Sequence, residues 1–356
     1  MKDIYSEIIQ FRGSHYDFGY MQGMRLKDSL TVINRENQWK VRKPRFKIDE
    51  QEAKREIKRF APGIWDELLG LQDALEWPMQ QVLQEFGGYR VEYNRSGCSI
   101  LTGEDYLIRN YDYHPKTYEG RYVLYQPTDG KGYAMIGPSQ RGTGRMDGMN
   151  EHGLAVGYNF MNRKKPGDGF ICCMIGRLIL ESCATVAEAA AMLKEIPHRH
   201  SFSYVVYDRD GEAVVIETSP RNVEVRKAAA CTNHFEIMKD ENRRHLVDSE
   251  RRLKVIEDSR AAASLNAHQA FRLLNDTEKG VFSDLYGSWA GTIHTTAYLP
   301  HQMKAWIALG GDREPVEFDF GKWLEETDLE EERITGAVDT DIPFLHMDEN
   351  EDWYKR

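Results

Sequence analysis

The order of helical and strand patterns constrains the fold of this 356-residue chain more than any other feature. Residues 49–86 carry apolar side chains at three- and four-residue spacing, which predicts helices. From Cys98 onward the pattern changes to short β-rich runs that end at Gly, Asp or Pro. Further helices are predicted at 171–195, 242–259 and 266–276. The succession of helices, strands, helices and strands favours an α+β fold, with helices outside an antiparallel sheet system.

Capping and turn residues set the expected limits of these segments. One helix should begin at Ser14 or Asp17 and run to Ile33. Pro62-Gly63 and Trp77-Pro78 should interrupt the helical region that follows. Strands are expected at 4–11, 98–102, 105–111, 121–126, 132–137 and 153–160, and as two hairpins, 203–208 with 213–218 and 292–298 with 304–310.

Composition is that of an ordinary globular protein, with 41% apolar and 29% charged residues, enough for one large domain or two smaller ones. The net charge of −10 argues against non-specific nucleic-acid binding, which needs a basic stripe. Acidic runs at 325–332 and 348–352 are expected to form a solvated surface and tail. Neither a membrane-spanning run nor a signal-peptide pattern is recognisable, so we expect a cytoplasmic protein without membrane partners.

The cysteines do not suggest a disulfide framework, because their number is odd and their spacing irregular. Cys172-Cys173 is not a Cys-x-x-Cys pair and has no histidine at metal-ligand spacing. Gly142-Thr143-Gly144 lacks the strand and helix that flank a phosphate-binding loop. We therefore expect neither a metal nor a nucleotide cofactor. The five cysteines are Cys98, Cys172, Cys173, Cys183 and Cys231.

Cys98 is a candidate nucleophile because Gly97 precedes it. Glycine lets the backbone bend sharply, so the sulfur can reach the carbonyl carbon of Gly97. If that peptide bond breaks, Cys98 becomes an N-terminus with a thiol and an α-amino group. Such an amine has a pKa of roughly 7.7–8.0 and can act as a general base near neutral pH. The alternative is an inert buried cysteine, which is common in folded proteins.

Five short blocks follow one another from Cys98 and extend over most of residues 98–310. In this order they resemble the cysteine-type N-terminal nucleophile amidohydrolases. That group includes the choloylglycine hydrolases and the acyl-CoA:6-aminopenicillanate (isopenicillin N) acyltransferases. The blocks are Cys98-Ser99, Arg109-Asn110-Tyr111-Asp112, Asn150-Glu151-His152-Gly153-Leu154 with Tyr158-Asn159-Phe160, Thr232-Asn233-His234-Phe235 and, more weakly, Ser249-Glu250-Arg251-Arg252.

The resemblance implies a four-layer αββα sandwich of the N-terminal nucleophile hydrolase type. Residues 1–97 resemble the mostly helical pro-segment of the acyltransferase branch, with an opening at Gly13-Ser14-His15-Tyr16-Asp17-Phe18-Gly19. Such a pro-segment is cut between Gly97 and Cys98 and stays bound as a small subunit. Residues 98–356 would then form the catalytic domain, which ends in the acidic tail.

The resemblance also implies roles for individual residues around the nucleophile. Cys98 would attack an amide or thioester carbonyl and form an acyl-enzyme. The carboxylate of Asp112 would hold the new amino group, and Arg109 would add positive charge near the sulfur.

Three further residues match positions near the nucleophile in that family. Asn233 corresponds to an asparagine that donates to the oxyanion of the tetrahedral intermediate. Asn159 corresponds to a second active-site asparagine. Arg252 corresponds to an arginine beside the nucleophile, although its neighbour Arg251 fits the same motif after a shift of one residue.

The function that follows is a self-processing hydrolase or acyltransferase of linear C–N amides. Its partners would be a small acyl amide as substrate and an acyl-CoA or amine in the transfer reaction. Two alternatives remain open. One is an unprocessed thiol hydrolase with His234 or His294 as base, and the other is a non-catalytic binder of small acylated ligands. His114 and His152 also lie near the blocks, and we expect them to support the pocket.

Overall fold

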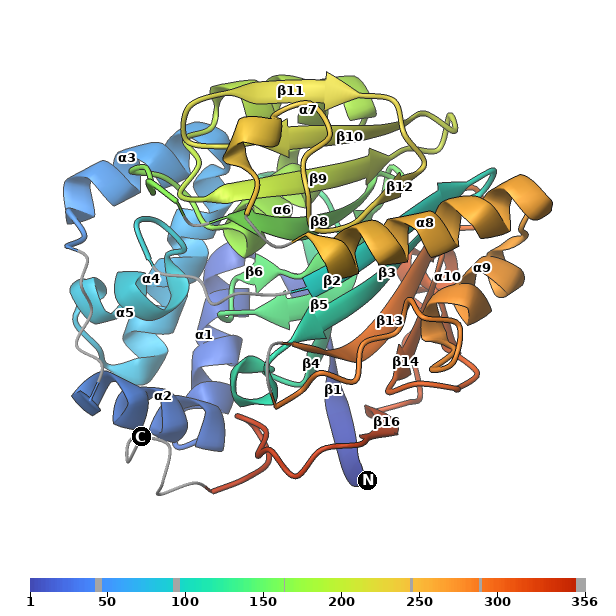
Figure 1. Cartoon of the computed structure of the whole chain (residues 1–356). Helices are drawn as coiled ribbons and strands as arrows, with labels where there is room; N and C mark the ends of the chain where they lie inside the picture. Colours follow the sequence, from blue (N-terminus) through green and yellow to red (C-terminus); the bar gives the residue numbers. More distant parts are fainter. Residues whose placement is uncertain (42–46, 92–96, 163, 244–245, 288–289, 350–356) are drawn as a thin grey trace.

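Two β-sheets packed face to face form the centre of the molecule (Figure 1). Helices α6 (Cys172–Ser182) and α7 (Val186–Glu195) pack on the larger sheet. Helices α8 (Val247–Ala262) and α9 (Ala267–Asn275) pack on the smaller one. The layer order is therefore helix, sheet, sheet, helix, which confirms the predicted αββα sandwich.

The computed structural model describes the whole chain except residues 42–46, 92–96, 163, 244–245, 288–289 and 350–356. Within the described residues the larger sheet has the strand order β11-β10-β9-β8-β7-β5-β4-β1-β16, and β6 pairs with β5. The smaller sheet has the order β12-β2-β3-β13-β14-β15. The strands are β1 (Lys2–Gly13), β2 (Gly97–Gly103), β3 (Tyr106–Tyr113), β4 (Arg121–Pro127), β5 (Met135–Gln140), β6 (Gly144–Arg145), β7 (Asp147–Asn150), β8 (Ala155–Asn162), β9 (Ser201–Tyr207), β10 (Ala213–Thr218), β11 (Val223–Arg226), β12 (Ala230–Cys231), β13 (Gly291–Leu299), β14 (Lys304–Leu309), β15 (Val316–Asp319) and β16 (Arg333–Val338).

The first strand lies inside the larger sheet, although it belongs to the proposed pro-segment. β1 runs parallel to β4 and antiparallel to β16, and so lies between them. Residues 1–97 therefore share a sheet with the rest of the chain instead of forming a separate unit. The boundary at Gly97-Cys98 stays a prediction.

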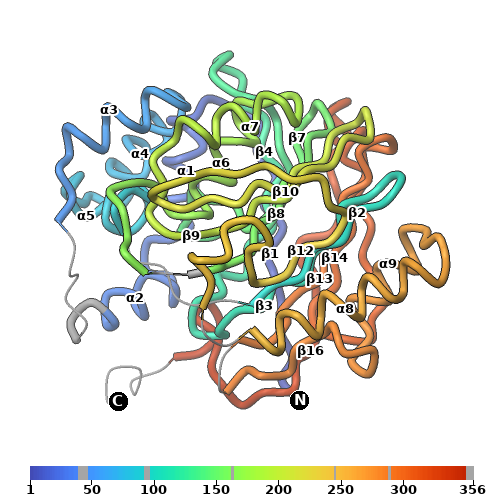
Figure 2. The backbone as a smooth tube through the Cα atoms, turned by 45° about the horizontal axis from the view of Figure 1, so that its top comes forward, coloured from blue at the N-terminus to red at the C-terminus, as the bar shows by residue number. Residues whose placement is uncertain are grey.

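The helices of the first 97 residues gather on one side of the sheets, away from α8 and α9 (Figures 1 and 2). They are α1 (His15–Leu26), α2 (Leu30–Val41), α3 (Glu50–Phe60), α4 (Pro62–Leu75) and α5 (Met79–Phe86).

Two glycines let α1 and α4 cross at very short range. A Cβ at Gly19 would lie 2.0 Å from the carbonyl oxygen of Glu67, and one at Gly70 would lie 2.1 Å from that of Tyr16. Any side chain at these positions would force the two backbones apart.

Two predicted helices were wrong in their extent, because capping residues divide each of them. The helix expected to run to Ile33 ends at Leu26, and α2 begins at Leu30, beyond Asp28 with its positive φ of 65°. The helix expected at 171–195 is divided into α6 and α7. The hydroxyl of Thr185 accepts a hydrogen bond from the backbone N–H of Glu188 and begins the second helix.

The other boundaries agree with the sequence in most places. Pro62 is the first residue of α4, where its missing N–H costs no helical hydrogen bond. Both predicted hairpins form, as β9 with β10 and β13 with β14. The short helix α10 (Phe320–Leu324) follows β15.

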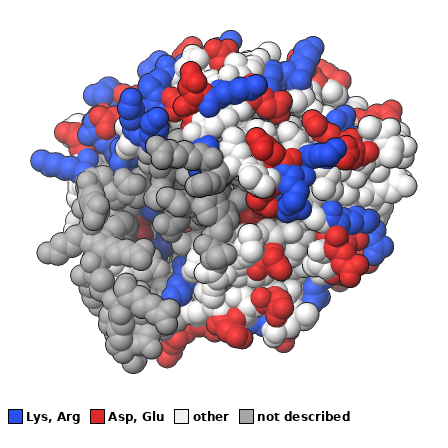
Figure 3. Space-filling model, viewed as in Figure 1, with Lys and Arg blue, Asp and Glu red and all other residues white. Residues whose placement is uncertain are grey.

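One face of the molecule carries charge in small patches of both signs. On the face seen in Figure 3, basic and acidic side chains alternate outside the undescribed atoms. None of the described helices is both long and apolar enough to cross a membrane.

Candidate active site

Cys98 is the second residue of β2 and lies at the interface of the two sheets. In the ladder of β2 with β3, Cys98 lies opposite Tyr111 and Gly97 opposite Asp112. Side chains alternate along a strand, so Arg109 and Tyr111 share the face of Cys98, and Asp112 points to the opposite face. The side chain of Cys98 is fully buried. Its sulfur therefore lies between the sheets, not at the surface.

The sulfur of Cys98 accepts a hydrogen bond from Arg109, whose Nη2 lies 3.1 Å away. The same nitrogen donates to the carbonyl oxygen of Tyr158 on β8 at 2.5 Å. The guanidinium carbon lies 4.9 Å from the ring centre of Tyr111 and 4.7 Å from that of Tyr158. Arg109 thus places a fixed positive charge at the thiol, and its part in catalysis stays a prediction.

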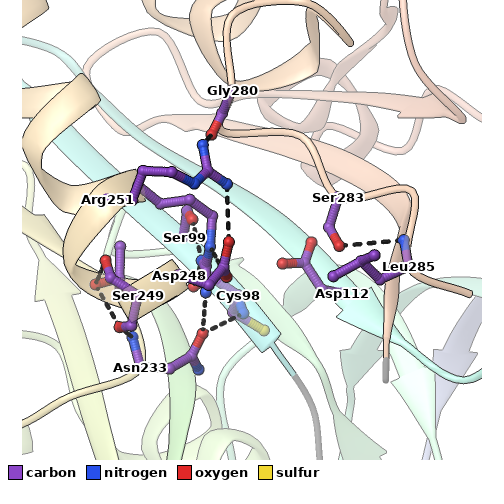
Figure 4. Close-up of polar contacts among 12 residues, drawn as sticks. Cys98, Ser99, Asp112, Asn233, Asp248, Ser249, Arg251, Gly280, Ser283 and Leu285 are labelled. Atoms are coloured by element: carbon purple, nitrogen blue, oxygen red, sulfur yellow. Dashed lines mark hydrogen bonds and ion pairs between the residues drawn. The ribbon is translucent and has the colours of Figure 1, made fainter. Parts of the chain in front are cut away.

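The backbone of Cys98 is held from the side of α8. Arg252 donates from Nη1 to the carbonyl oxygen of Cys98 at 2.8 Å and to the hydroxyl of Ser99 at 2.6 Å. Arg251 instead reaches the carbonyl oxygen of Gly280 and the carboxylate of Asp248 (Figure 4). Arg252, and not its neighbour, is therefore the arginine beside the candidate nucleophile.

The side chain of Asn233 contacts the backbone N–H of Cys98. Its Oδ1 accepts this hydrogen bond at 2.9 Å and a second one from Nη2 of Arg252 at 2.8 Å. Its Nδ2 donates to the carbonyl oxygen of Phe160 at 2.9 Å. In the intact chain one of the two N–H donors of Nδ2 is thus occupied, and the oxyanion role stays a prediction.

Asp112 is buried on the α8 side of β3 and accepts a hydrogen bond from the hydroxyl of Thr292 at 2.7 Å. Burial raises the pKa of Asp112 to about 6, against the positive charge of Arg252. Figure 4 shows Asp112 and Asn233 on opposite sides of Cys98, and the described contact of the Cys98 nitrogen is with Asn233. The predicted contact between Asp112 and a new amino group stays a prediction.

Asn159 does not reach the sulfur and instead braces the segment that carries Asn233. Its Nδ2 donates to the carbonyl oxygens of Cys231 at 2.9 Å and Thr232 at 3.1 Å. These bonds join β8 of the larger sheet to the end of β12 in the smaller one. The Oδ1 of Asn159 is buried without a described partner.

A match to a known protein family is consistent with this geometry. The family model for acyl-coenzyme A:6-aminopenicillanic acid acyl-transferase covers residues 101–314, about three fifths of the chain. The chain belongs to this family. The matched region of this acyltransferase-family chain contains Arg109, Asp112, Asn159, Asn233 and Arg252 and begins three residues after Cys98. No match was found among curated protein sequences.

Several solved structures show partial similarity to the acyltransferase-family chain. A mutant conjugated bile acid hydrolase from Clostridium perfringens is 14% identical, with a TM-score of 0.45 over 64% of this chain and 93% of its own. A penicillin V acylase from Agrobacterium tumefaciens is 16% identical, with a TM-score of 0.45 over 64% and 86%. A Caenorhabditis elegans ortholog of N-acylethanolamine-hydrolyzing acid amidase is 13% identical, with a TM-score of 0.39 over 57% and 93%. Family membership therefore rests on the family model and not on these likenesses.

The thiol of Cys98 is a poor nucleophile in the intact acyltransferase-family chain. Burial raises its pKa to about 11, although the charges of Arg109 and Arg252 act in the opposite direction. The negative charge of Asp112 adds to the increase. At neutral pH the sulfur is therefore protonated and requires a proton acceptor before it can attack.

The histidines near the site do not supply that acceptor. His234 bonds to the hydroxyl of Ser249 at 2.8 Å, and His294 stacks on Tyr111 at 4.9 Å. Among the described residues, no histidine nitrogen forms a hydrogen bond with the sulfur of Cys98. The described part of the chain also holds no cluster of His, Cys, Asp and Glu that could bind a metal ion.

Sequence reasoning assigned no role to two residues behind the site. Asp147 on β7 pairs with Arg109, and Ser249 on α8 accepts from the backbone N–H of Asn233. Asp147 lies three positions before the block that begins at Asn150. The available signal was a lone acid between Met146 and Gly148.

Proposed function

We propose that the chain is a self-processing cysteine amidohydrolase or acyltransferase that cleaves linear C–N amide bonds through an acyl-enzyme on Cys98. The observation that carries this proposal is the hydrogen bond from Arg109 to the sulfur of a cysteine that follows glycine, in a member of the acyltransferase family. The contacts of Arg252 and Asn233 with the same residue support it.

Processing would begin with attack of the Cys98 sulfur on the carbonyl carbon of Gly97. A C–S bond forms, the C–N bond breaks, and the thiol proton passes to the released amine. Water then hydrolyses the thioester, which leaves a carboxylate on Gly97 and a free thiol and α-amine on Cys98. Arg252 and Asn233 hold the two backbone atoms of Cys98 during this exchange.

Turnover would use the new amine as the base that the histidines do not provide. The amine takes the thiol proton as the sulfur attacks the substrate carbonyl and returns it to the leaving nitrogen. Water then releases the acyl group as an acid, or an acceptor amine takes it as a new amide. The Nδ2 of Asn233 would donate to the oxyanion through the second N–H, the one not bonded to the carbonyl oxygen of Phe160.

The substrate class that fits is a small molecule with an acyl amide or acyl thioester. A suitable panel contains 6-aminopenicillanic acid with an acyl-CoA, a conjugated bile acid, penicillin V and an N-acylethanolamine. The release of the amine or of free CoA from each compound, measured by mass spectrometry, ranks them directly. A protein that is processed but binds these compounds without turnover would instead be the non-catalytic binder.

Self-cleavage is the first test of the proposal. Purified protein should give two fragments of about 11 and 30 kDa, a division of the 41.2 kDa chain in proportion to residue number, with Cys98 first in the larger one. Cys98→Ala should stay one chain, and Cys183→Ala, a matched change at another buried cysteine, should still be cut. Denaturing electrophoresis and intact mass measure this. A wild-type protein that stays whole and still hydrolyses amides would rule out the α-amine as base.

A further inference from the structure

Arg109 needs a partner of opposite charge, because its guanidinium is completely buried. A buried cation without an anion is strongly destabilising. Four hydrogen bonds of Arg109 are described, and three of them go to the sulfur of Cys98 and to the carbonyl oxygens of Met146 and Tyr158. The fourth goes to Asp147, the carboxylate that pairs with Arg109.

Asp147 is itself fixed at both carboxylate oxygens. Its Oδ2 lies 2.6 Å from Nη1 of Arg109. Its Oδ1 accepts hydrogen bonds from the hydroxyls of Thr296 at 3.1 Å and Tyr298 at 2.5 Å, both on β13. Asp147 therefore connects β7 of the larger sheet to β3 and β13 of the smaller one, directly behind Arg109.

The space around Arg109 leaves it one orientation. The rings of Tyr111 and Tyr158 hold the guanidinium by cation–π contacts. Gly157 gives it room, because a Cβ there would lie 2.9 Å from Cδ of Arg109 and 3.0 Å from Cδ1 of Ile100. The rings and the missing side chain limit the position of the guanidinium, and Asp147 sets its rotation.

The charges around Asp147 keep it ionised near neutral pH. Burial opposes ionisation, but the nearby His294, the charge of Arg109 and the hydroxyl of Tyr298 lower the pKa of Asp147 to about 2. Tyr118 and Tyr122 also face it and stay protonated, because burial raises their pKa. The charges that face Cys98 are Arg109, Asp112 and Arg252.

We propose that Asp147 is a positioning residue that holds the Arg109 guanidinium against the sulfur of Cys98. The proposal deepens the proposed function, since it gives Arg109 its place at the nucleophile. For loss of the Asp147 charge, it predicts a shift in the thiol pKa of Cys98 opposite in sign to that of a simple charge effect. Removal of a negative charge alone would lower the pKa of the thiol, whereas loss of the positioned arginine would raise it.

The test measures the thiol pKa of Cys98 without use of enzyme activity. Full-length protein is alkylated with iodoacetamide over a range of pH, digested with trypsin and analysed by mass spectrometry. The tryptic peptide is 96–109 in intact protein and 98–109 in processed protein, so both states are read separately. Asp147→Asn should shift the pH midpoint of alkylation upward by about one unit, equal to roughly tenfold slower reaction below the midpoint.

Four further variants make the result decisive. Arg109→Met, in which the loss of the cleavage site extends the tryptic peptide to Lys116, should shift the midpoint in the same direction. The double variant should go no further, because both changes remove the same contact. Glu119→Gln is the matched control, a buried carboxylate paired with Arg35 and Arg121, and should leave the midpoint unchanged. Tyr298→Phe removes one bond to Asp147 and should give a smaller upward shift even if Asp147→Asn does not fold.

A midpoint that falls or does not move in Asp147→Asn, or effects that add in the double variant, would overturn the positioning role. The proposed function can fail separately. If the midpoints shift as expected but the protein neither cleaves itself nor releases an acyl group, the positioning role stands and the proposed activity does not.

Discussion

Three side chains from different parts of the fold hold the three polar groups of Cys98. Asn233 takes its N–H, Arg252 its carbonyl oxygen and Arg109 its sulfur. The N–H contact has a simple origin in the ladder of β2 with β12. The register places Cys231 opposite Ile100, so two steps further along, position 233 lies opposite Cys98. The Asn233 side chain therefore acts where the next strand partner would have been.

The variant Asn233→Asp distinguishes the acceptor role of the Asn233 side chain from its donor role. The change keeps an oxygen for the N–H of Cys98 and for Arg252 but removes the N–H that would stabilise the oxyanion. We expect acylation to slow by roughly a hundredfold to a thousandfold while processed protein stays folded. Asn275→Asp, which alters a buried asparagine bonded to Thr295 and Gly310, should leave acylation unchanged. Single-turnover kinetics measure the effect, and acylation within a few-fold of wild type would mean that Asn233 has only a structural part.

Most of the candidate site residues could be predicted from the sequence, because they lie in short blocks with a recognisable order. Cys98, Arg109, Asn233 and Arg252 are indeed neighbours in the structure. Asp147 could not be found in this way. Its partners lie on strands of the other sheet, and nothing in a single strand shows which distant side chains it will face.

At the scale of elements, a buried polar cluster joins the first 97 residues to α6. His15 on α1 contacts Glu181 on α6 and lies 2.9 Å from Asp129. Arg177 on α6 donates to Glu67 on α4 at 2.8 Å and to Glu181 at 2.7 Å. Charged side chains on both sides of the predicted cleavage point are thus paired inside the protein.

This cluster predicts a pH dependence of stability. Burial opposes protonation of His15, but the hydrogen bond and charge of Glu181 outweigh it and raise the pKa of His15 above 6.5. The folded state therefore binds the proton more tightly than the unfolded state. The contribution is fully present below about pH 6.5 and is lost as the pH rises through the higher folded value, with a slope of at most about 1.4 kcal/mol per pH unit.

Urea denaturation between pH 5 and 9 checks this expectation. His15→Gln should flatten the decrease in unfolding free energy, and His268→Gln, at an exposed position, should not. An equal slope in wild type and His15→Gln would mean that His15 is neutral in the folded state.

The helices and hairpins were predictable where local residues decide them, as at Pro62 and at the turn between the strands expected at 203–208 and 213–218. The joins between α1 and α2 and between α6 and α7 were not, because apolar spacing continues across both breaks. The position of β1 was also beyond sequence reasoning. Its neighbours β4 and β16 lie more than one hundred and more than three hundred residues away along the chain.

For the molecule as a whole, β1 joins the edge strand β16 to the rest of the larger sheet. β16 follows β1 at the sheet edge, and β4 lies on the other side of β1. If the chain is cut after Gly97, the covalent link that placed β1 between these strands is lost. Refolding then requires the association of two separate fragments.

Refolding of processed protein from denaturant should therefore depend on protein concentration, with lower yield on greater dilution. Cys98→Ala, which stays one chain, should refold with a yield independent of concentration below the onset of aggregation. Recovery of native fluorescence after dilution measures both. Equal, concentration-independent recovery would show that the fragments stay associated in denaturant or that no cut occurs.

The burial of Cys98 and Gly97 determines at which stage of folding the bond between them could be cut. An external protease cannot reach this bond in the folded state, and an unfolded chain has no Arg109 beside the sulfur. If the chain cuts itself, the cut can then occur only after the chain has reached its native arrangement. A free cysteine at the start of the larger fragment would be a permanent record of correct folding, and the ratio of cut to uncut chains in a preparation would count how many molecules had ever folded.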